Sequence, residues 1–421
     1  MRAALFKLKR SVLLPAALSG LLTAPFAGAA DVEFLHWWTS EGEKKALEVL
    51  VEQLENSNLD LTPVPVLGGG GDSAMTVLQA RALAGNTPSF AQIEGPSIKA
   101  WDAIGILYPL NEVAQENNWN EVLYPLSQEI NTTQNGYVAL PLTLHRLNWL
   151  WINNKLLKQL DLEPPQTWQD MFNAIEKARD ANLIPLAIGE EPWQIAQLFE
   201  SLVIATGGVE FYKRTLVELD PRYIDSDTMR FALSQLRRLF SLRVDGLEDD
   251  KWDTAAKALA EDRALFQIGG DWVLGDLLAR GIKVPEHVGC QNAPQSHNTF
   301  LYNMDSLIFM VSKEFSEREA NQLAQVLAAK DFQERFNQVK GSIPVRMDID
   351  LSNFNPCQVK SYEDFVYAQK HNLGVPSLTN SMAVNPVAKK AINSEIFRFY
   401  RNNSISEDQM IKRFISIATS N

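Results

Sequence analysis

The sequence predicts an α/β protein of two domains. Strand and helix patterns alternate over residues 31–100, and the alternation restarts after residues 139–146 and again at residues 300–307. Beyond its first thirty residues the chain has about 390 more, which is enough for two domains that each bury a core of their own. Because no low-complexity linker separates the two regions, we expect several short hinges between the domains.

The first strands and helix are marked by local signals. "DVEFLHWW", residues 31–38, alternates and is rich in β-forming side chains, which predicts a strand. Ser40 followed by Glu43 is a capping box, and apolar residues then recur at helical spacing, so we expect a helix over residues 41–56. "LDLTPVPVL", residues 59–67, is predicted as a second strand, and its prolines favour an edge position.

A run of glycines follows the second strand. "GGGGDS", residues 68–73, lacks the Lys-Ser/Thr of a phosphate-binding loop and does not fit the GxGxxG spacing. Two interpretations stay open: a tight turn before a helix, or a loop that presents backbone NH groups and Asp72 to a polar ligand. "PSFAQIEG", residues 88–95, supplies a third strand. Strands that alternate with helices in this way are typical of a parallel sheet.

The rest of the chain is predicted from the same patterns. Residues 135–160 predict a β-hairpin-like stretch that runs into a helix, and residues 168–243 are mostly helical by their apolar spacing. "RALFQIGGDWVLGDLLARG", residues 263–281, is predicted as strand, glycine turn and helix. Another strand is expected over residues 300–313, and helices dominate the tail from about residue 315.

The amino terminus has the features of a secretory signal peptide. Basic residues lie within the first ten positions, an apolar stretch follows, and "AGAA" supplies small residues for cleavage. We therefore assign residues 1–30 to a signal peptide and expect an exported protein. No later run is long and apolar enough to cross a bilayer. Removal of the four basic residues of the signal takes the formal charge from −12 to −16, which argues against nucleic acid as a partner.

The chain has two cysteines, Cys290 and Cys357. In an oxidising compartment they most simply form one disulfide, and two buried thiols are the alternative. There is no CxxC motif and no cluster of cysteine with histidine, and the five histidines are scattered. We therefore expect no zinc or other metal site.

The sequence carries no recognisable catalytic motif. There is no GxSxG and no HExxH, and paired carboxylates such as Glu190-Glu191 and Asp249-Asp250 are typical of solvated loops. We therefore expect no catalytic residues. A glycosidase that uses carboxylates far apart in the sequence is the alternative.

The tryptophans indicate a carbohydrate site. All ten lie between Trp37 and Trp272, and several stand in polar, turn-like surroundings, as in "HWWTSEGE", "EEPWQIA", "DDKWDTA" and "GGDWVLG". Tryptophans of a core more often stand in apolar runs such as "NWLWIN". An indole face can cover the apolar C–H patch of a pyranose while polar neighbours bind its hydroxyl groups. A single tryptophan is more often structural, but the four stretches together predict ligand contact.

Seven stretches together resemble one family of proteins. "HWWTSEGEKKA", "GGGGDSAMTVLQAR", "HRLNWLWINN", "EPWQIAQLFES", "GDW", "NMDSL" and "KGSIPVR" are similar, in this order, to segments of periplasmic glucose-binding proteins of ABC sugar importers, which are family 1 extracellular solute-binding proteins. The resemblance covers essentially the whole chain after residue 30. It implies the two-lobed periplasmic-binding-protein fold, maltose-binding-protein-like, with discontinuous lobes and a central ligand cleft. It also implies a periplasmic monomer that binds a small sugar and an ABC permease, without cofactor or catalysis.

The resemblance also implies lobes and ligand contacts. We expect residues 31–140 and 303–343 to form the N-terminal lobe, and residues 141–302 and 344–421 to form the C-terminal lobe. Together with the polar surroundings of the tryptophans, it predicts ligand contacts at Trp37, Trp38, Glu41, Asp72, Glu94, Trp193, Asp271, Trp272, Asn303, Asp305, Lys340 and Asn380. One of the two paired tryptophans would then cover the sugar, while the other packs behind it or closes the pocket.

Two of these positions differ from the family pattern. Relatives commonly read "QIKGP" where this chain has "QIEGP", so Glu94 replaces a lysine, and Asn380 stands where relatives carry a histidine. An ionised carboxylate accepts hydrogen bonds but does not donate them. Glu94 would therefore accept from sugar hydroxyls or pair with an ammonium group, as in glucosamine, unless Lys340 neutralises it and a neutral sugar is retained. The identity of the sugar stays open, as does a sensor function that uses the same cleft.

Overall fold

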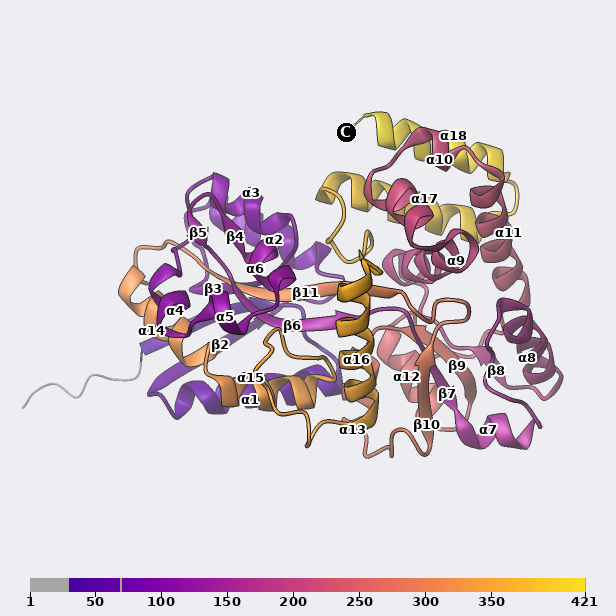
Figure 1. Ribbon diagram of the computed structural model, residues 1–421, viewed down its shortest axis with the longest axis horizontal. Helices are drawn as coiled ribbons and strands as arrows, with labels where there is room; N and C mark the ends of the chain where they lie inside the picture. Colours follow the sequence, from indigo (N-terminus) through magenta and orange to yellow (C-terminus); the bar gives the residue numbers. More distant parts are fainter. Residues whose placement is uncertain (1–29, 69, 421) are drawn as a thin grey trace, which may run out of the picture.

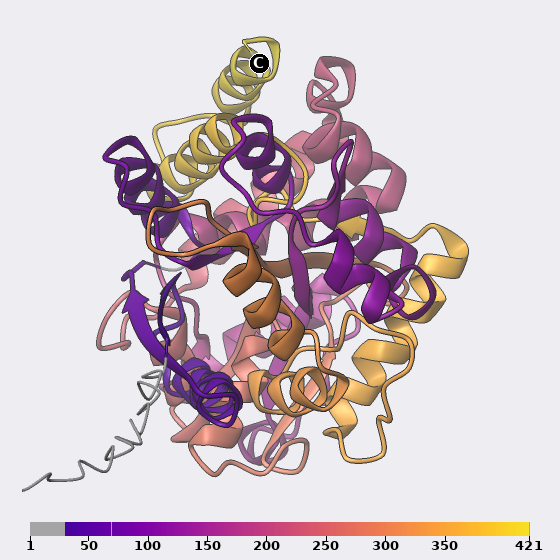
Figure 2. The same cartoon turned by 90° about the vertical axis from the view of Figure 1, so that its left-hand side faces the viewer.

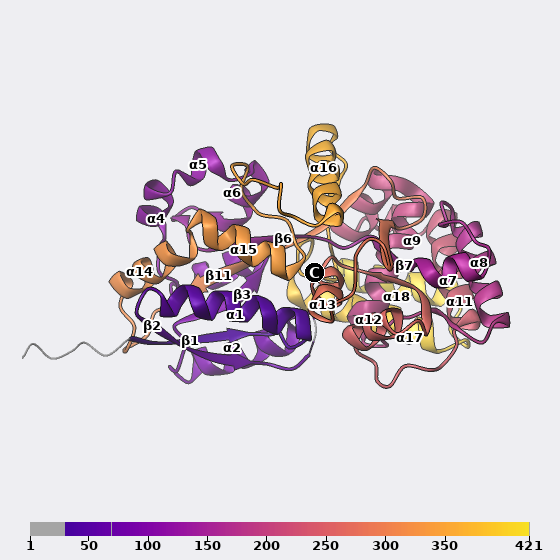
Figure 3. The ribbon, with the colours of Figure 1, turned by 90° about the horizontal axis from the view of Figure 1, so that it is seen from below.

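The computed structural model describes residues 30–68 and 70–420. Two lobes lie side by side, each with its own β-sheet, and helix α16 (Pro356–His371) stands between them (Figure 1, Figure 3). The expected signal peptide lies outside the described residues except for Ala30, which begins the first strand. None of the described helices combines the length and the apolar character that a membrane span needs.

The first lobe is built on a six-stranded sheet. Its strands are β1 (Ala30–His36), β2 (Leu59–Pro65), β3 (Phe90–Glu94), β6 (Leu140–Arg146), β11 (Phe300–Phe309) and β12 (Gly374–Pro376). The order is β12-β11-β3-β1-β2, and β6 pairs with β11. The parallel arrangement of β1, β2 and β3 confirms the prediction, and the proline-containing β2 lies at the edge. β11 is antiparallel to both β3 and β6.

Helices cover both faces of this sheet (Figure 2). They are α1 (Glu41–Glu55), α2 (Asp72–Leu83), α3 (Ser97–Ala103), α4 (Asn111–Glu116), α5 (Trp119–Val122), α6 (Pro125–Asn131), α14 (Glu317–Leu327) and α15 (Lys330–Lys340), with a ribbon of β4 (Thr132–Thr133) and β5 (Gly136–Tyr137). Phe34 and Leu35 enter different apolar clusters because successive side chains of a strand point to opposite faces. The predicted capping box of Ser40 and Glu43 at the start of α1 is confirmed.

The second lobe contains a four-stranded sheet in the order β10-β7-β9-β8. Its strands are β7 (Trp149–Asn153), β8 (Ile184–Leu186), β9 (Ala264–Gly269) and β10 (Val288–Asn292). Its helical segments are α7 (Asn154–Gln159), α8 (Trp168–Asp180), α9 (Pro192–Tyr212), the π-helical turn η1 (Lys213–Val217), α10 (Pro221–Ile224), α11 (Asp227–Leu242), α12 (Trp252–Ala260), α13 (Trp272–Ala279), α17 (Pro386–Arg401) and α18 (Glu407–Thr419). The predicted strand, glycine turn and helix of residues 263–281 are confirmed as β9 and α13.

The hairpin expected within residues 135–160 is wrong in its pairing. β6 pairs with β11 in the first sheet, whereas β7 pairs with β9 and β10 in the second. Only Leu147 and Asn148 lie between β6 and β7. The chain therefore passes from one lobe to the other at this point, and it does not fold back. Two short apolar strands are the same sequence signal for both arrangements, so periodicity cannot tell them apart.

The lobe boundaries expected from the sequence stay a proposal. β6 continues the first sheet as far as Arg146, and β12 joins the same sheet from the tail of the chain. Helices α17 and α18 of that tail pack on α9, α10 and α11 in the second lobe. The tail after residue 343 thus contributes to both lobes.

A disulfide joins Cys290 and Cys357, as the preferred interpretation of the two cysteines predicts. Cys290 lies on β10, and Cys357 lies in the first turn of α16 and packs in the core of the second lobe. Further along the same helix, Phe365 and Ala368 belong to a core cluster of the first lobe. The disulfide therefore fastens the helix between the lobes to the sheet of the second lobe.

Replacement of both cysteines by serine should lower the free energy of unfolding. The bond spans a sequence separation of 67 residues, and the chain-entropy model assigns about 4 kcal/mol to a loop of this length. Guanidinium unfolding of the double variant Cys290→Ser/Cys357→Ser measures the loss, with reduced wild-type protein as the matched control. Both should unfold at a lower denaturant concentration than the oxidised protein. Equal midpoints for the oxidised protein and the variant would contradict this account.

Candidate functional site

A cavity of about 360 Å³ lies in the cleft between the lobes. Residues of both lobes line it, among them most of the ligand contacts expected from the sequence. These are Trp37, Trp38, Glu94, Trp193, Trp272, Asn303, Asp305, Lys340 and Asn380. The cavity brings together segments that are as much as 343 positions apart, from Trp37 to Asn380.

Strands of the first sheet position the polar side of the cavity. Glu94 is the last residue of β3, and it lies directly opposite Asp305 in the antiparallel pair of β3 and β11. Asn303 lies two residues earlier on β11, so its side chain faces the same side as that of Asp305. Every residue of β11 is buried. The polar groups are therefore carried by rigid backbone at the carboxyl end of β3, the edge at which ligands of open α/β sheets bind.

The paired tryptophans separate to the two faces of the sheet. Trp37 packs in the cluster that contains Leu35, whereas Trp38 packs in the cluster that contains Phe34 and Phe336. Both rings border the cavity, with exposed fractions of 9% for Trp37 and 1% for Trp38. Trp37 thus offers the more accessible ring, while Trp38 rests 5.3 Å from the ring of Phe336.

Three tryptophans of the second lobe form the opposite, aromatic wall. Trp272 meets Trp193 with ring centroids 6.1 Å apart and Trp252 with centroids 6.3 Å apart, both nearly edge to face. His145 also meets Trp272 edge to face, at 5.6 Å. Among the described residues, no ring lies parallel to that of Trp272, because its three ring neighbours approach in these tilted geometries. Its indole is available to stack on a planar or apolar ligand face.

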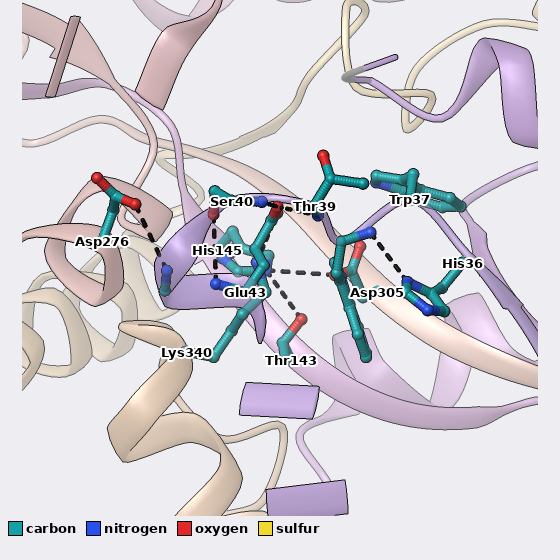
Figure 4. Close-up of polar contacts among 12 residues, drawn as sticks. His36, Trp37, Thr39, Ser40, Glu43, Thr143, His145, Asp276, Asp305 and Lys340 are labelled. Carbon is teal, nitrogen blue, oxygen red and sulfur yellow. Dashed lines mark hydrogen bonds and ion pairs between the residues drawn. The ribbon is translucent and has the colours of Figure 1, made fainter. Parts of the chain in front are cut away.

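Lys340 and Glu43 form an ion pair at the cavity wall (Figure 4). Nζ of Lys340 lies 3.2 Å from Oε1 of Glu43 and 5.8 Å from the centre of the Trp38 ring. Oε2 of Glu43 accepts from the backbone nitrogens of Thr39 and Ser40 at 2.9 and 3.1 Å. Glu43, which caps the start of α1, therefore also binds Lys340 at the end of α15. Lys340 thus pairs with Glu43 and not with Glu94. The alternative that Lys340 neutralises Glu94 and so retains a neutral sugar loses its support.

His145 connects the two lobes through two carboxylates, of which Figure 4 shows Asp305. Its Nδ1 lies 2.5 Å from Asp271 of the second lobe, and its Nε2 lies 3.5 Å from Asp305 and 3.0 Å from Oγ1 of Thr143. Burial of the ring lowers its pKa, but Asp271 and Asp305 outweigh burial and raise the pKa to about 9. The imidazolium in turn lowers the pKa of Asp305 against the opposing effect of burial. At neutral pH this is a buried cation held between two anions.

Glu94 is a buried carboxylate on the cavity wall whose pKa is raised. It is 5% exposed, and Nδ2 of Asn303 donates to its Oε1 at 2.6 Å. Burial first, and then the neighbouring Asp305, raise its pKa to about 8.

Three residues expected to contact ligand do not line the cavity. Glu41 is exposed and pairs with Lys44 at 3.8 Å. Asp72 pairs with the buried Lys389 at 2.5 Å. Asp271 lies behind His145, and its Oδ2 accepts from the backbone nitrogen of Arg146 at 2.9 Å. Asp271 therefore positions the strand that carries His145 and does not reach the cavity.

Several cavity residues were not predicted from the sequence. They are the polar residues Thr39, Ser40, Glu43, His145, Glu191, Lys251 and Asp253, whereas Trp252 was predicted only through its stretch "DDKWDTA" and not as a named contact. "DDKWDTA" marks Trp252 by its polar surroundings, and the capping box marks Glu43 as a residue that folds back over the start of its helix. His145 has the weaker signal of a titratable side chain inside an apolar strand.

The site holds groups suited to binding. Glu43 and Asp305 are committed to ion pairs, and the other wall is aromatic. In the part of the chain that the structure describes, no group of three or more His, Cys, Asp and Glu residues is arranged to hold a metal ion.

Residues 37–304 match the family of bacterial extracellular solute-binding proteins. The chain belongs to this family. A probable sugar-binding periplasmic protein of Rhizobium meliloti (strain 1021) is 34% identical over 390 residues, which are 92% of this chain and 94% of that protein. The family expected from the resemblance is therefore confirmed.

Solved structures of solute-binding proteins have the same fold. A chitin oligosaccharide binding protein aligns with a TM-score of 0.78 and 16% identity, over 93% of this chain and 98% of its own. The maltose/maltodextrin-binding domain of Bdellovibrio bacteriovorus, bound to maltotriose, aligns with a TM-score of 0.71 and 17% identity, over 93% of this chain and 99% of its own. The α/β, maltose-binding-protein-like fold class is thus confirmed.

Replacement of His145 by glutamine should flatten the pH dependence of stability. The pKa of His145 is about 9 in the folded protein against 6.5 for an unperturbed histidine. A raised folded pKa adds stability that is fully present below pH 6.5 and is lost as the pH rises through 9. Unfolding free energies measured across this range should therefore fall more steeply for wild type than for the variant.

The control for this measurement is His371→Gln, because His371 is exposed at the end of α16. In the control, the free energy of unfolding should fall with pH as steeply as in wild type. If it falls as steeply in His145→Gln too, His145 is not charged in the folded protein.

Proposed function

We propose that this protein captures a monosaccharide or short oligosaccharide in the periplasm and delivers it to an ABC permease, without catalysis. The observation that carries the proposal is the cavity between the lobes, which is lined by Trp37 of one lobe, Trp272 of the other, and the polar residues Asn303, Asp305 and Asn380. Indole faces cover the apolar faces of a sugar ring, and amides and carboxylates bind its hydroxyl groups. The names of the relatives, which include sugar-binding periplasmic proteins, support the same ligand class.

The ionic contacts favour binding over glycoside hydrolysis. A glycosidase needs one carboxylic acid to protonate the leaving group and a second carboxylate as base or nucleophile. Here Glu43 and Asp305 are each paired with a cation and Glu94 is bonded to Asn303, which leaves Glu191 and Asp253 as the other lining carboxylates, without an ion pair among the described residues. Residues from both lobes would enclose a sugar in this cavity, so ligand-linked closure of the lobes would present both to a permease.

Incubation of the pure protein with a panel of sugars should quench tryptophan fluorescence saturably and yield no product. The quenching is expected because five of the ten tryptophans border the cavity. Chromatography of the recovered sugars tests for turnover. Release of a smaller sugar from a disaccharide would favour the glycoside-acting enzyme and reject the proposal.

Replacement of Trp272 by alanine should weaken sugar binding far more than folding. The change removes an aromatic face from the cavity wall, and loss of such a contact costs on the order of 2–4 kcal/mol of binding free energy. Calorimetry measures the affinity, and thermal unfolding measures the stability of the same preparation.

The matched control is Trp101→Ala. Trp101 is 7% exposed, close to the 9% of Trp272, but it packs in a cluster of the first lobe and does not line the cavity. Its loss should lower stability and leave the affinity of the folded fraction unchanged. Unchanged affinity after Trp272→Ala would place the sugar elsewhere.

A further inference from the structure

The carboxylates of the cavity differ in how their charge is balanced. Glu43 pairs with Lys340 at 3.2 Å, and Asp305 pairs with His145 at 3.5 Å. Among the described residues, no Lys, Arg or His nitrogen lies within 4.0 Å of the carboxylate of Glu94. Glu94 is nevertheless almost fully buried. It is therefore a buried carboxylate whose charge the described part of the chain does not neutralise by direct contact.

The nearest cations are engaged elsewhere. Nζ of Lys389 lies 2.5 Å from Asp72 and donates to Oγ of Ser381 at 2.8 Å. His145 is held by Asp271 and Asp305. Both cations favour the ionised form of Glu94 through space, but burial and Asp305 oppose ionisation more strongly. The positive charges around Glu94 thus have carboxylate partners of their own.

Asn303 adds an unsatisfied acceptor beside Glu94. Its Nδ2 donates to Oε1 of Glu94 at 2.6 Å, and its Oδ1 is buried and has no hydrogen-bond partner among the described residues. Both side chains border the cavity. A buried acceptor without a partner is costly and marks a place where a ligand or water donates. An ammonium group supplies three N–H donors and one positive charge, which matches this pair of acceptors.

We propose that Glu94 and Asn303 together bind an ammonium group of the ligand, so that the substrate class of this protein is amino sugars. The inference rests on the proposed function, because it places the sugar in the same cavity. The ammonium nitrogen donates to a carboxylate oxygen of Glu94 and to Oδ1 of Asn303. A charge-assisted hydrogen bond in a partly dry cleft is stronger than a bond between a neutral hydroxyl and the same carboxylate.

The rest of the cavity is also suited to a cation. Glu191 and Asp253 border it, and neither has a cation within 4.0 Å among the described residues. Lys251, the remaining lysine of the lining, lies 3.5 Å from Asp249. Indole faces attract cations through the negative potential over the ring. Glu191, Asp253 and the indole rings of the lining therefore favour positive charge as well.

Without a ligand, a proton takes the place of the ammonium group. Burial and Asp305 raise the pKa of Glu94 to about 8, so its carboxyl group is largely neutral at pH 6.5. Binding of an ammonium group would ionise Glu94 and release that proton. The contrary outcome is a protonated Glu94 that stays neutral and donates its O–H to a neutral sugar.

Calorimetry on wild-type protein tests the charge of the ligand directly. The probes are glucosamine, galactosamine and mannosamine, each compared at pH 6.5 with its parent hexose and with its N-acetyl derivative. At least one free amino sugar should bind roughly 10- to 100-fold more tightly than both of its neutral counterparts. Equal or weaker binding of all three amino sugars would overturn the inference. Since no substitution is involved, this arm does not depend on the folding of a variant.

A second arm assigns the preference to Glu94. Glu94→Gln keeps the size of the side chain and the acceptor for Nδ2 of Asn303, but it cannot ionise. It should lose the preference for the amino sugar and retain the neutral hexose. The matched control is Glu41→Gln, which removes the same charge from an exposed residue outside the cavity lining and should keep the preference.

The number of protons released on ligand binding shows whether Glu94→Gln loses the preference through its missing charge or through a changed shape of the cavity. Titrations in two buffers of different ionisation enthalpy should show release of about one proton per ammonium ligand in wild type and none in Glu94→Gln. Asp305, His145 and Lys389, which face Glu94, keep their partners in both proteins and so contribute equally. Zero release by wild type would overturn the inference.

The two levels of the proposal fail in different ways. If no sugar of the panel binds, the proposed function is rejected. If neutral hexoses bind and Glu94→Gln leaves the ranking of ligands unchanged, sugar capture stands and only the inference about amino sugars is rejected.

Discussion

The bridge of Asp271, His145 and Asp305 is the interaction on which the geometry of the cleft depends. Buried charges are tolerated only when they are paired, and here one imidazolium serves a carboxylate from each lobe. Asp271 also accepts from the backbone nitrogen of Arg146, at the point where the chain leaves the first sheet. His145 therefore neutralises Asp305 in the cavity, and it also binds Asp271, which fixes the backbone at the crossing between the lobes. Removal of His145 would leave both buried carboxylates without this shared cation.

Glycines let the lobes meet backbone to backbone beside this bridge. A Cβ atom on Gly42 of α1 would lie 2.4 Å from the backbone nitrogen of Asp276 on α13, and a Cβ atom on Gly275 would lie 2.6 Å from the carbonyl oxygen of Lys340. Neither position has room for a side chain. The close approach of α1, α13 and α15 brings Lys340, at the end of α15, and Trp272, at the start of α13, to one cavity. The close packing of these three helices therefore sets both the shape of the cavity and the position of the charged Lys340 in it.

Local patterns in the sequence predicted the elements, and non-local contacts decided what the sequence could not predict. The order of strands and helices in residues 31–95, the capping box of Ser40 and Glu43, and the disulfide of Cys290 and Cys357 follow from periodicity, capping and compartment. The pairing of β6 with β11 does not, because it depends on a partner more than 150 positions away. The same limit applies to the site. The polar neighbours of the tryptophans in the sequence predict ligand contact, whereas the bridging role of His145 depends on carboxylates that only folding brings next to it.

The glycine loop forms the expected turn before a helix, whereas its Asp72 pairs with a lysine and does not line the cavity. Gly70 and Gly71 have positive φ angles of 72° and 75°, which glycine adopts readily, and they form the tight turn that precedes α2. Gly70 also approaches the second lobe, since a Cβ atom there would lie 3.2 Å from Cγ of Trp193, and its carbonyl oxygen accepts from Lys389 at 3.4 Å. Asp72 completes this contact through its ion pair with Lys389. The loop thus meets the second lobe beside the cavity, and Asp72 neutralises the buried Lys389, whose charge acts through space on Glu94.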